Sequence, residues 1–419
     1  MLDIPAEVSS HTSELIALRR HFHEHPELSL METETMAYIQ DTLRSYGIES
    51  SHIPNAGILA VITGKGPGRT VLLRADIDAL PIEESAMNLS RQRVTRSTVK
   101  GVMHACGHDG HMAMLLVAAK ILAAHRDEWK GRVVLMFEQG EEQAGPVANF
   151  LRYLVNESGL TIDTAYATHV RWDVPAGKIV ISEAPPMAGG IGFIFKLRGR
   201  GGHGSRPDLA ENPFDCFHAF YGALQALRMR AVPPRECLTV SIGMVNGGFA
   251  PNIIPDELTF GGTARFFNYE KAGKPFYDEM LALLERECAN YHCSYEIIHL
   301  PPPLYEVRNH PECVALAREG ITRHLGANVL YDCEPWMASE SFAITARLFP
   351  SVLSFTGIQN LAKGCGANHH TAEFDMDEEG LPAGVAACLA YTLEFLDKQP
   401  HPTVPPLDLP LEEVITRNV

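Results

Sequence analysis

The chain has 419 residues, 46% hydrophobic and 21% charged, which is the composition of a globular protein large enough for two or three domains. Its formal net charge of -16 argues against nucleic acid and anionic membranes as partners, since both bind basic faces, and favours a small-molecule substrate. The start of the chain lacks a basic region followed by an apolar run, and no stretch reaches the roughly 18 apolar residues of a membrane span. The nine cysteines are scattered and do not form the spacing pattern of a disulfide framework. We therefore expect a cytoplasmic protein.

Residues 14–46 predict two amphipathic helices that are separated at His25-Pro26. The first helix carries His21, His23 and His25, a trio that resembles a metal cluster. Helical residues two positions apart point in different directions. We therefore interpret the trio as solvated, or as a support behind a site, and not as ligands.

Short apolar runs at 58–63, 70–73, 132–137 and 165–168 predict strands that are buried on both faces of a parallel sheet. Three of the runs are followed by polar groups, namely Asp76 and Asp78, Glu141 and Glu142, and His169. Ligands bind at the carboxyl edge of open α/β sheets. We expect these side chains to meet there, although the Glu pair alone would fit a solvated loop.

The stretch GVMHACGHDGH at 101–111 dominates the chain chemically, because Cys106, His108, Asp109 and His111 fall within six residues. A lone Cys is more often a small buried hydrophobe. Four such groups between glycines instead indicate a transition-metal site. The apolar run at 112–122 places this site where a loop enters a buried helix.

A basic loop precedes that stretch: residues 88–100 carry Arg91, Arg93, Arg96 and Lys100. The loop could attract an acidic substrate. Because loops are often charged, we favour a solvated loop.

Residues 189–299 have a different pattern, in which strands at 191–198, 238–245, 258–267 and 294–299 alternate with helices at 213–230 and 271–289. The order strand, helix, strand, strand, helix, strand predicts a ferredoxin-like domain. Helices at 311–325 and 381–396 and a strand at 352–355 then resume the α/β pattern.

The predicted fold is therefore α/β, with a mixed, mostly parallel sheet in the catalytic domain and an inserted ferredoxin-like α+β lid. Residues 1–185 and 301–400 form the catalytic domain, residues 186–300 the lid and dimerisation domain, and residues 401–419 a Pro-rich tail that is ordered only where it contacts the body.

Taken together, the motifs closely resemble those of the M20 metallopeptidase family, in the branch of hippurate hydrolases, aminoacylases and indole-acetyl amino acid hydrolases. The resemblance covers residues 14–398 and rests on RRHFHEHPE (19–27), LRADIDALP (73–81), HACGHDGH (104–111), Glu141-Glu142, His169, GRGGHGSRP (199–207), PNIIPD (251–256) and a late His. It implies a two-metal amidohydrolase that cleaves the amide of N-acyl amino acids or small peptides, and a homodimer or higher homo-oligomer.

The resemblance also assigns residues to roles. The implied metal ligands are Cys106, His108, Glu142, His169 and His370. They would hold two divalent ions, zinc, manganese or cobalt, and a thiolate ligand favours zinc or cobalt. Glu141 matches the general base. We expect its role to differ from that of Glu142, because adjacent side chains on an extended backbone point in opposite directions. His370 is preferred to His369 because the late ligand of the family stands four residues before a Phe, here Phe374.

Three residues of the inserted domain are candidates for substrate contacts. We expect Arg265 and Asn252 to hold the substrate carboxylate. His203, in a glycine-rich turn, would donate to the oxyanion, either on closure of the lid or from a partner subunit. Two departures from the family, Ser341 in place of Asp and Ala372 in place of Pro, concern substrate preference and not the chemistry.

Two alternatives remain at this point. One is a related deacylase that acts on N-acetyl-diaminopimelate or aminobenzoyl-glutamate. The other is a metal-binding protein without catalysis. The presence of Glu141 argues against the second, because a pure binding site needs no free carboxylate beside its ligands.

Overall fold

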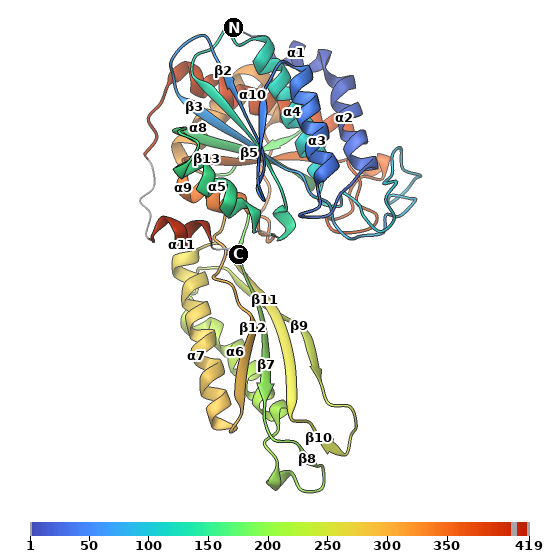
Figure 1. Cartoon of the computed structure of the whole chain (residues 1–419), viewed down its shortest axis with the longest axis vertical. Helices are drawn as coiled ribbons and strands as arrows, with labels where there is room; N and C mark the ends of the chain where they lie inside the picture. Colours follow the sequence, from blue (N-terminus) through green and yellow to red (C-terminus); the bar gives the residue numbers. More distant parts are fainter. Residues whose placement is uncertain (1, 144, 404–408, 417–419) are drawn as a thin grey trace.

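The computed structural model describes residues 2–143, 145–403 and 409–416. The chain forms a broad body from which a narrower arm extends, and each part has a β-sheet of its own (Figure 1). No helix among the described residues has the length and apolarity that a membrane crossing requires.

The body is built on a seven-stranded sheet with the order β1-β2-β4-β3-β5-β13-β6. Its four central strands, β4, β3, β5 and β13, are parallel, and the outer pairings are antiparallel. The strands are β1 (Ser50–Ile53), β2 (Gly57–Thr63), β3 (Thr70–Asp76), β4 (Arg132–Glu138), β5 (Thr164–Pro175), β6 (Ile179–Val180) and β13 (Ser351–Gln359). Every residue of β3 is buried, as expected for a strand covered on both faces.

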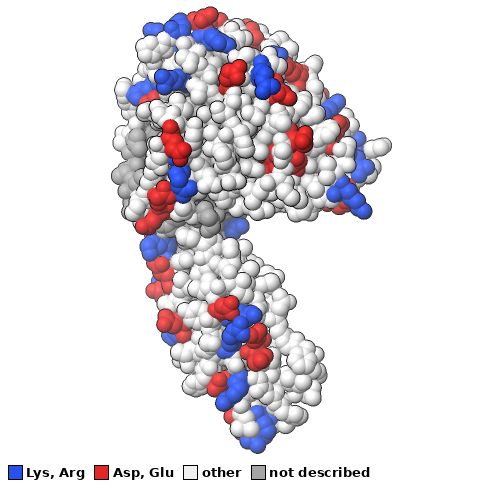
Figure 2. Space-filling model, in the orientation of Figure 1, with Lys and Arg blue, Asp and Glu red and all other residues white. Residues whose placement is uncertain are grey.

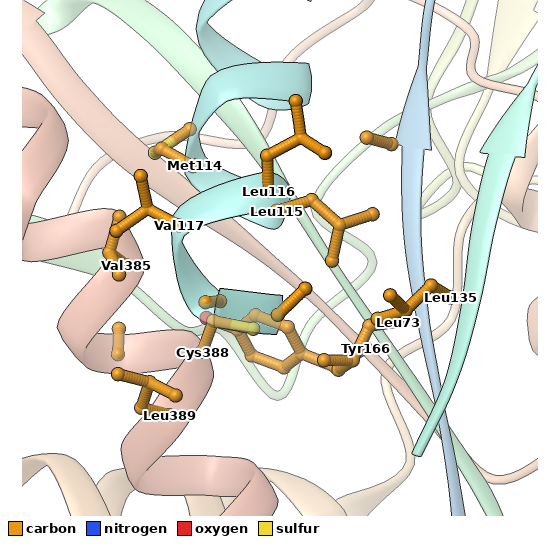
Figure 3. Close-up of a cluster of buried hydrophobic side chains, with 14 of the residues drawn as sticks. Leu73, Met114, Leu115, Leu116, Val117, Leu135, Tyr166, Val385, Cys388 and Leu389 are labelled. Carbon is orange, nitrogen blue, oxygen red and sulfur yellow. The ribbon is translucent and has the colours of Figure 1, made fainter. Parts of the chain in front are cut away.

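Helices cover both faces of this sheet and divide the hydrophobic core into two clusters. One face packs against α1 (Ile4–Ser10), α2 (Thr12–Glu24), α3 (Thr33–Ser45), α4 (His108–Ala124), α8 (Pro311–Leu325) and α10 (Leu381–Lys398). Figure 3 shows this face, where Leu115 and Leu116 of α4 lie near Leu73 of β3 and Leu135 of β4. The other face packs against α5 (Pro146–Asn156), α9 (Phe342–Leu348) and α11 (Leu411–Ile415).

Because α4 is apolar all round, 15 of its residues are buried and the helix lies between the sheet and α10. Its first residue is His108, so burial of the helix determines where the Cys-His stretch lies. The core thereby brings the predicted metal-binding stretch to the carboxyl ends of the parallel strands.

The arm is the predicted ferredoxin-like insertion. Its antiparallel sheet has the order β12-β7-β11-β9, and Figure 1 shows both helices on one face. The elements are β7 (Gly189–Arg198), α6 (Pro213–Ala231), β9 (Leu238–Gly247), β11 (Glu257–Phe266), α7 (Lys274–Asn290) and β12 (Ser294–His299). At its far end β8 (Gly202–His203) pairs with β10 (Ile253–Ile254).

Several expectations were incomplete or wrong. His169 does not follow its strand but lies inside β5, because β5 continues beside β13 after its pairing with β3 has ended at Ala167. The short elements α1, β1, α5 and α9 were not predicted. Of the tail, α11 buries Val414 and Ile415 against the body, while residues 404–408 and 417–419 lie outside the described part of the chain.

Candidate metal centre

The structure brings the five proposed ligands together at the carboxyl edge of the large sheet. The ligand atoms of Cys106, His108 and His169 all lie within 4.8 Å of one another, and so do those of Cys106, Glu142 and His370. Gly107 makes the turn between the first two residues possible: its φ is 92°, and a Cβ there would lie 2.3 Å from a methyl group of Val170.

Hydrogen bonds from the far side of each ring orient two of these histidines. Nδ1 of His108 donates to the backbone and side-chain oxygens of Asp78, at 2.9 and 3.1 Å. Nδ1 of His169 donates to the carbonyl of Val170 at 2.7 Å. The Nε2 lone pairs of both rings are thereby directed to the cluster, which is how proteins hold histidine ligands of metals.

Two atoms at the centre of the cluster show that the donor set fits a metal. Nε2 of His108 and Oε1 of Glu142 are buried and have no hydrogen-bond partner among the described residues. Unsatisfied buried polar atoms are costly, so such atoms need a partner from outside the chain. A thiolate, imidazoles and a carboxylate together suit a borderline-soft divalent ion.

The two late histidines differ in orientation. His369 is buried, its Nδ1 donates to the carbonyl of Cys106 at 3.1 Å, and its ring packs against that of Trp336 at a tilt of 38°, with a centroid distance of 4.7 Å. His370 adopts a left-handed backbone with φ 61°, and its Nε2 lies 3.1 Å from Oε1 of Glu142. Although Nε2 of His369 also lacks a partner, it is His370 whose ligand atom joins the cluster.

The other two groups of the Cys-His stretch are already paired within the protein. Asp109 accepts from Nδ1 of His23 at 2.8 Å and lies 2.9 Å from Nε of Arg19. His111 binds Asp76 through Nδ1 at 2.6 Å and accepts from the backbone amide of Val170 at 2.8 Å. Both therefore support the loop through bonds within the protein, although the ligand atoms of Asp76, His108 and His111 also lie within 4.8 Å of one another.

His23 is fully buried, so of the two interpretations of the trio the support behind a site, and not the solvated one, holds for this residue. Its second nitrogen, Nε2, lies 2.9 Å from a carboxylate oxygen of Glu84. Burial opposes a charge on the ring, but the bonds to Asp109 and Glu84 raise the pKa of His23 above its ordinary value. The ring of His23, hydrogen-bonded between two carboxylates, thus ties α2 to the residue that follows His108.

Glu141 and Glu142 lie in a 3-10 turn (Glu141–Gln143), so the expected extended backbone was wrong. Their roles can still be divided, because their partners differ. Oε1 of Glu141 accepts from the backbone amide of Ser341 at 2.9 Å, whereas Oε1 of Glu142 faces the histidines. Burial, with Glu340 and Glu142 close by, raises the pKa of Glu141 well above its usual range, as a proton acceptor requires.

Ser341, the departure in the Ser-Glu-Ser-Phe motif, is hydrogen-bonded on several sides. Its hydroxyl donates to Glu138 at 2.6 Å and accepts from Nη2 of Arg74 at 2.8 Å. Its amide holds Glu141. The short side chain thus fits between Arg74 and a buried carboxylate without a negative charge of its own.

A cavity of about 230 Å³ joins the carboxylates to the base of the arm, where the molecule is hollowed between its two parts (Figure 2). Glu141 and Glu142 line one side, and Gly190, Thr263 and Arg265 of β7 and β11 line the other. No ion pair involves Arg265 in the described part of the chain, and burial lowers its pKa. A cation without a counterion therefore faces the proposed catalytic carboxylates.

The other two candidates in the arm lie away from this cavity. In the pairing of β11 with β7, Phe266 lies opposite Gly189 near the body, and Glu257 lies opposite Arg198 at the outer end of the arm. At about 3.3 Å per residue, Glu257 is roughly 26 Å from Arg265. His203 lies beyond that end, exposed, with its Nδ1 bonded to Ser205. The carbonyl of Asn252 accepts from Gly204 beside it. Within one chain, Asn252 therefore does not join Arg265, contrary to expectation.

The basic loop is only partly solvated. Arg91, Arg96 and Lys100 are exposed, but Arg93 is buried, which corrects the solvated interpretation for that residue. Arg93 donates at 2.8 Å to the carbonyls of Ser85 and Ala372. It thus ties the basic loop to the segment that carries His370. A charged loop residue shows no signal in the sequence that would reveal this internal bond.

Comparison with known proteins gives consistent matches over almost the whole chain. A family model described as peptidase family M20/M25/M40 matches residues 72–394. Thermostable carboxypeptidase 2 of Saccharolobus solfataricus is 32% identical over 92% of this chain and 96% of its own length. IAA-amino acid hydrolase ILR1-like 2 of Arabidopsis thaliana is 30% identical over 92% of this chain and 86% of its own length. The crystal structure of Bacillus subtilis YxeP, a dinuclear metal-binding peptidase from the M20 family, superposes with a TM-score of 0.77 at 30% identity, covering 93% of this chain and 99% of that one.

Proposed function

Because the chain belongs to peptidase family M20/M25/M40 and so is a metal-dependent hydrolase of amide bonds, we propose that it removes the acyl group from N-acyl amino acids, with Glu141 as the general base. The observation that carries this proposal is the cavity itself. It places Glu141, whose Oε1 is held by the backbone amide of Ser341, on one side, and on the other Arg265, which forms no ion pair among the described residues.

Two divalent ions would be held by Cys106, His108, Glu142, His169 and His370, whose ligand atoms form the cluster described above. When bound, they would supply Lewis acidity toward the carbonyl and activate water at neutral pH. The thiol among the donors favours zinc or cobalt, with manganese as the third candidate.

Glu141 takes the proton from the attacking water and passes it to the leaving amine. The Ser341 amide occupies only Oε1 of Glu141, which leaves Oε2 for that proton. The same amide keeps the carboxylate directed to the cavity. Glu142, the neighbouring carboxylate, is assigned to the ions because its Oε1 is buried and faces the ligand nitrogens, 4.0 Å from Nε2 of His108 and 3.1 Å from Nε2 of His370.

Arg265 binds the carboxylate of the substrate. Its guanidinium is largely buried beside Gly190, where a Cβ would lie 3.4 Å from Nη1, so the absence of a side chain keeps the approach open. A two-pronged pair with a carboxylate would offset the cost of burying this cation. The free acid end of an amino acid would thereby be held at a fixed distance from the ligand cluster.

The oxyanion donor comes from the arm of a second subunit. His203 and Asn252 lie together at the exposed tip, beyond the outer end of β11, which is itself roughly 26 Å from Arg265. β9 is an edge strand of the arm sheet with free backbone groups. We assign residues 186–300 to a lid and dimerisation domain that places His203 over the site of its partner.

The nine cysteines form no disulfide, which supports a reducing, cytoplasmic setting.

A substrate panel tests the proposal. Protein loaded with zinc, manganese or cobalt is incubated with hippurate, N-acetyl amino acids, a dipeptide, N-acetyl-diaminopimelate and aminobenzoyl-glutamate, and free amine is measured with ninhydrin. Release from N-acyl amino acids that is abolished by a chelator and restored by metal is expected. Preference for either of the last two compounds would make the related deacylase the better assignment, and metal binding without any hydrolysis would leave a binding protein.

A further inference from the structure

The turn that carries Glu141 and Glu142 is held from behind by a buried carboxylate, Glu32, that the proposed chemistry does not use. Oε1 of Glu32 accepts from the backbone amide of Gly140 at 2.8 Å, and Oε2 accepts from Nε2 of Gln139 at 2.8 Å. The residue is fully buried. Both oxygens thus bind groups immediately before Glu141.

The backbone at Gly140 requires such a support. Its φ is +67°, and a Cβ would lie 2.9 Å from Pro146 and 3.0 Å from Leu30. Only glycine fits this left-handed and crowded position readily, and glycine is also the residue with the greatest backbone freedom. An unsupported turn at this point would let the direction of Glu141 vary.

Glu32 and Asp78 hold amides on opposite sides of the base. Asp78 accepts from the amide of Glu142 at 3.0 Å and from the hydroxyl of Ser29 at 2.6 Å. Asp78 also contacts the proposed ligand His108, whereas the carboxylate of Glu32 makes no hydrogen bond to a proposed ligand in the described part of the chain. Burial raises the pKa of Glu32 to about 7, while the bonds from Gln139 and Gly140 act in the opposite direction and favour the carboxylate.

We propose that Glu32 is a positioning residue, which fixes the direction of Glu141 by anchoring Gly140 and Gln139, and which acts on turnover without acting on metal binding. The proposal rests on the assignment of Glu141 as general base. It places a requirement for catalysis in the connection between α2 and α3, outside every metal-binding motif of the chain.

The test uses the full-length, metal-loaded protein with the variants Glu32→Ala and Glu32→Gln. Glu32→Ala loses both bonds, and a misplacement of about 1 Å at a reacting group costs roughly 10²-fold. We expect kcat to fall by about that factor in Glu32→Ala and by less in Glu32→Gln, which keeps one acceptor. KM and the content of two metals per chain should stay at the parent values.

A matched control lies five residues away. Glu27 accepts from the backbone amides of Glu34 and Thr35 at 3.2 and 2.8 Å, and among the described contacts it makes no hydrogen bond to residues 139–142. Glu27→Gln should lower the melting temperature and leave kcat within twofold. Hydrogen exchange gives a readout that does not depend on activity: the peptide covering 138–143 should lose protection in both Glu32 variants and keep it in Glu27→Gln.

The outcomes separate the two proposals. A parent enzyme that releases no amine from any N-acyl amino acid counts against the proposed function, and the exchange experiment then still decides whether Glu32 holds the turn. If an active parent has the same kcat as Glu32→Ala, or if metal content falls in step with kcat, the positioning role is wrong. Unchanged protection at 138–143 in Glu32→Ala likewise contradicts it.

Discussion

The ligand cluster and the tip of the arm are built in opposite ways. Around Cys106, His108 and Glu142, the hydrogen-bond partners are buried and come from α2, β3, β5 and the loop before α4. At the tip, β8 and β10 form a two-residue ribbon, and the exposed side chain of His203 is hydrogen-bonded to Ser205 in its own turn. The first region is supported by residues of its own chain, whereas the proposed function assigns the second to the site of a partner subunit.

This difference separates two kinds of requirement. A metal site must exclude competing geometries, which calls for rigid support behind each ligand. An oxyanion donor on a mobile or partner-supplied element is brought in only when the site closes, which keeps the cavity open for substrate entry. The comparison predicts that changes at the cluster affect metal binding, whereas changes at the tip affect turnover alone.

Cys106→Ser should have the largest effect. A serine hydroxyl does not ionise near neutral pH, so the thiolate donor is lost, and even the loss of an outer partner of a ligand costs 10- to about 100-fold in metal affinity. We expect metal content by elemental analysis to fall together with activity while the circular dichroism spectrum is retained. Parent and variant with equal metal content would remove Cys106 from the ligand set.

His203→Ala should reduce turnover next most. Loss of one oxyanion donor costs roughly 10²- to 10³-fold in kcat. Metal content should not change, because no described contact joins His203 to the cluster. Mixing this variant with Glu141→Gln tests its origin: recovered activity in mixed dimers indicates a donor from the partner, and no recovery confines His203 to its own chain.

Arg265→Lys should have a smaller effect that depends on the substrate. Lysine keeps the charge but loses the two-pronged pairing, so KM for free-acid substrates should rise by roughly tenfold, which corresponds to about 1.4 kcal/mol. The matching amides of these substrates should be affected little. If both classes lose affinity equally, Arg265 supports structure and does not read the carboxylate.

His23→Gln should leave turnover nearly unchanged and lower stability. Because the folded-state pKa of His23 is raised, the bonds to Asp109 and Glu84 stabilise the protein most below the unfolded pKa of about 6.5. That contribution is lost as the pH rises through the folded-state pKa. We therefore expect the difference in the free energy of unfolding between parent and variant, measured with urea, to become smaller as the pH increases. A difference that grows with pH would contradict a protonated His23.

The sequence predicted the fold because its signals are local. Alternation between buried runs and amphipathic segments gave the central strands and the ferredoxin-like arm, including β12 and α8 to the residue. Short elements such as β1 and α9 were not predicted, because they depend on packing against the body. The predicted strand at 165–168 is shorter than β5, because β5 continues along β13.

The candidate site was predictable only where residue type alone carries chemistry. Cys106 and His108 stand out by their spacing, whereas the buried roles of Arg93 and Glu32 follow from contacts with Ala372 and Gly140, far away in sequence. The 3-10 turn at Glu141 was likewise not predicted: it follows a left-handed Gly140 whose amide is bonded to Glu32, a contact between residues far apart in sequence.

The central claim is that Glu141 is a base beside the ions and not one of their ligands, and one measurement tests it directly. Glu141→Gln is purified with metal, its metal content is determined by elemental analysis, and its kcat is measured on the best N-acyl amino acid. The account predicts an unchanged metal content and a kcat lowered by roughly 10²- to 10⁴-fold, the usual cost of losing a general base. Turnover at the parent rate, or loss of metal in proportion to loss of activity, would contradict it.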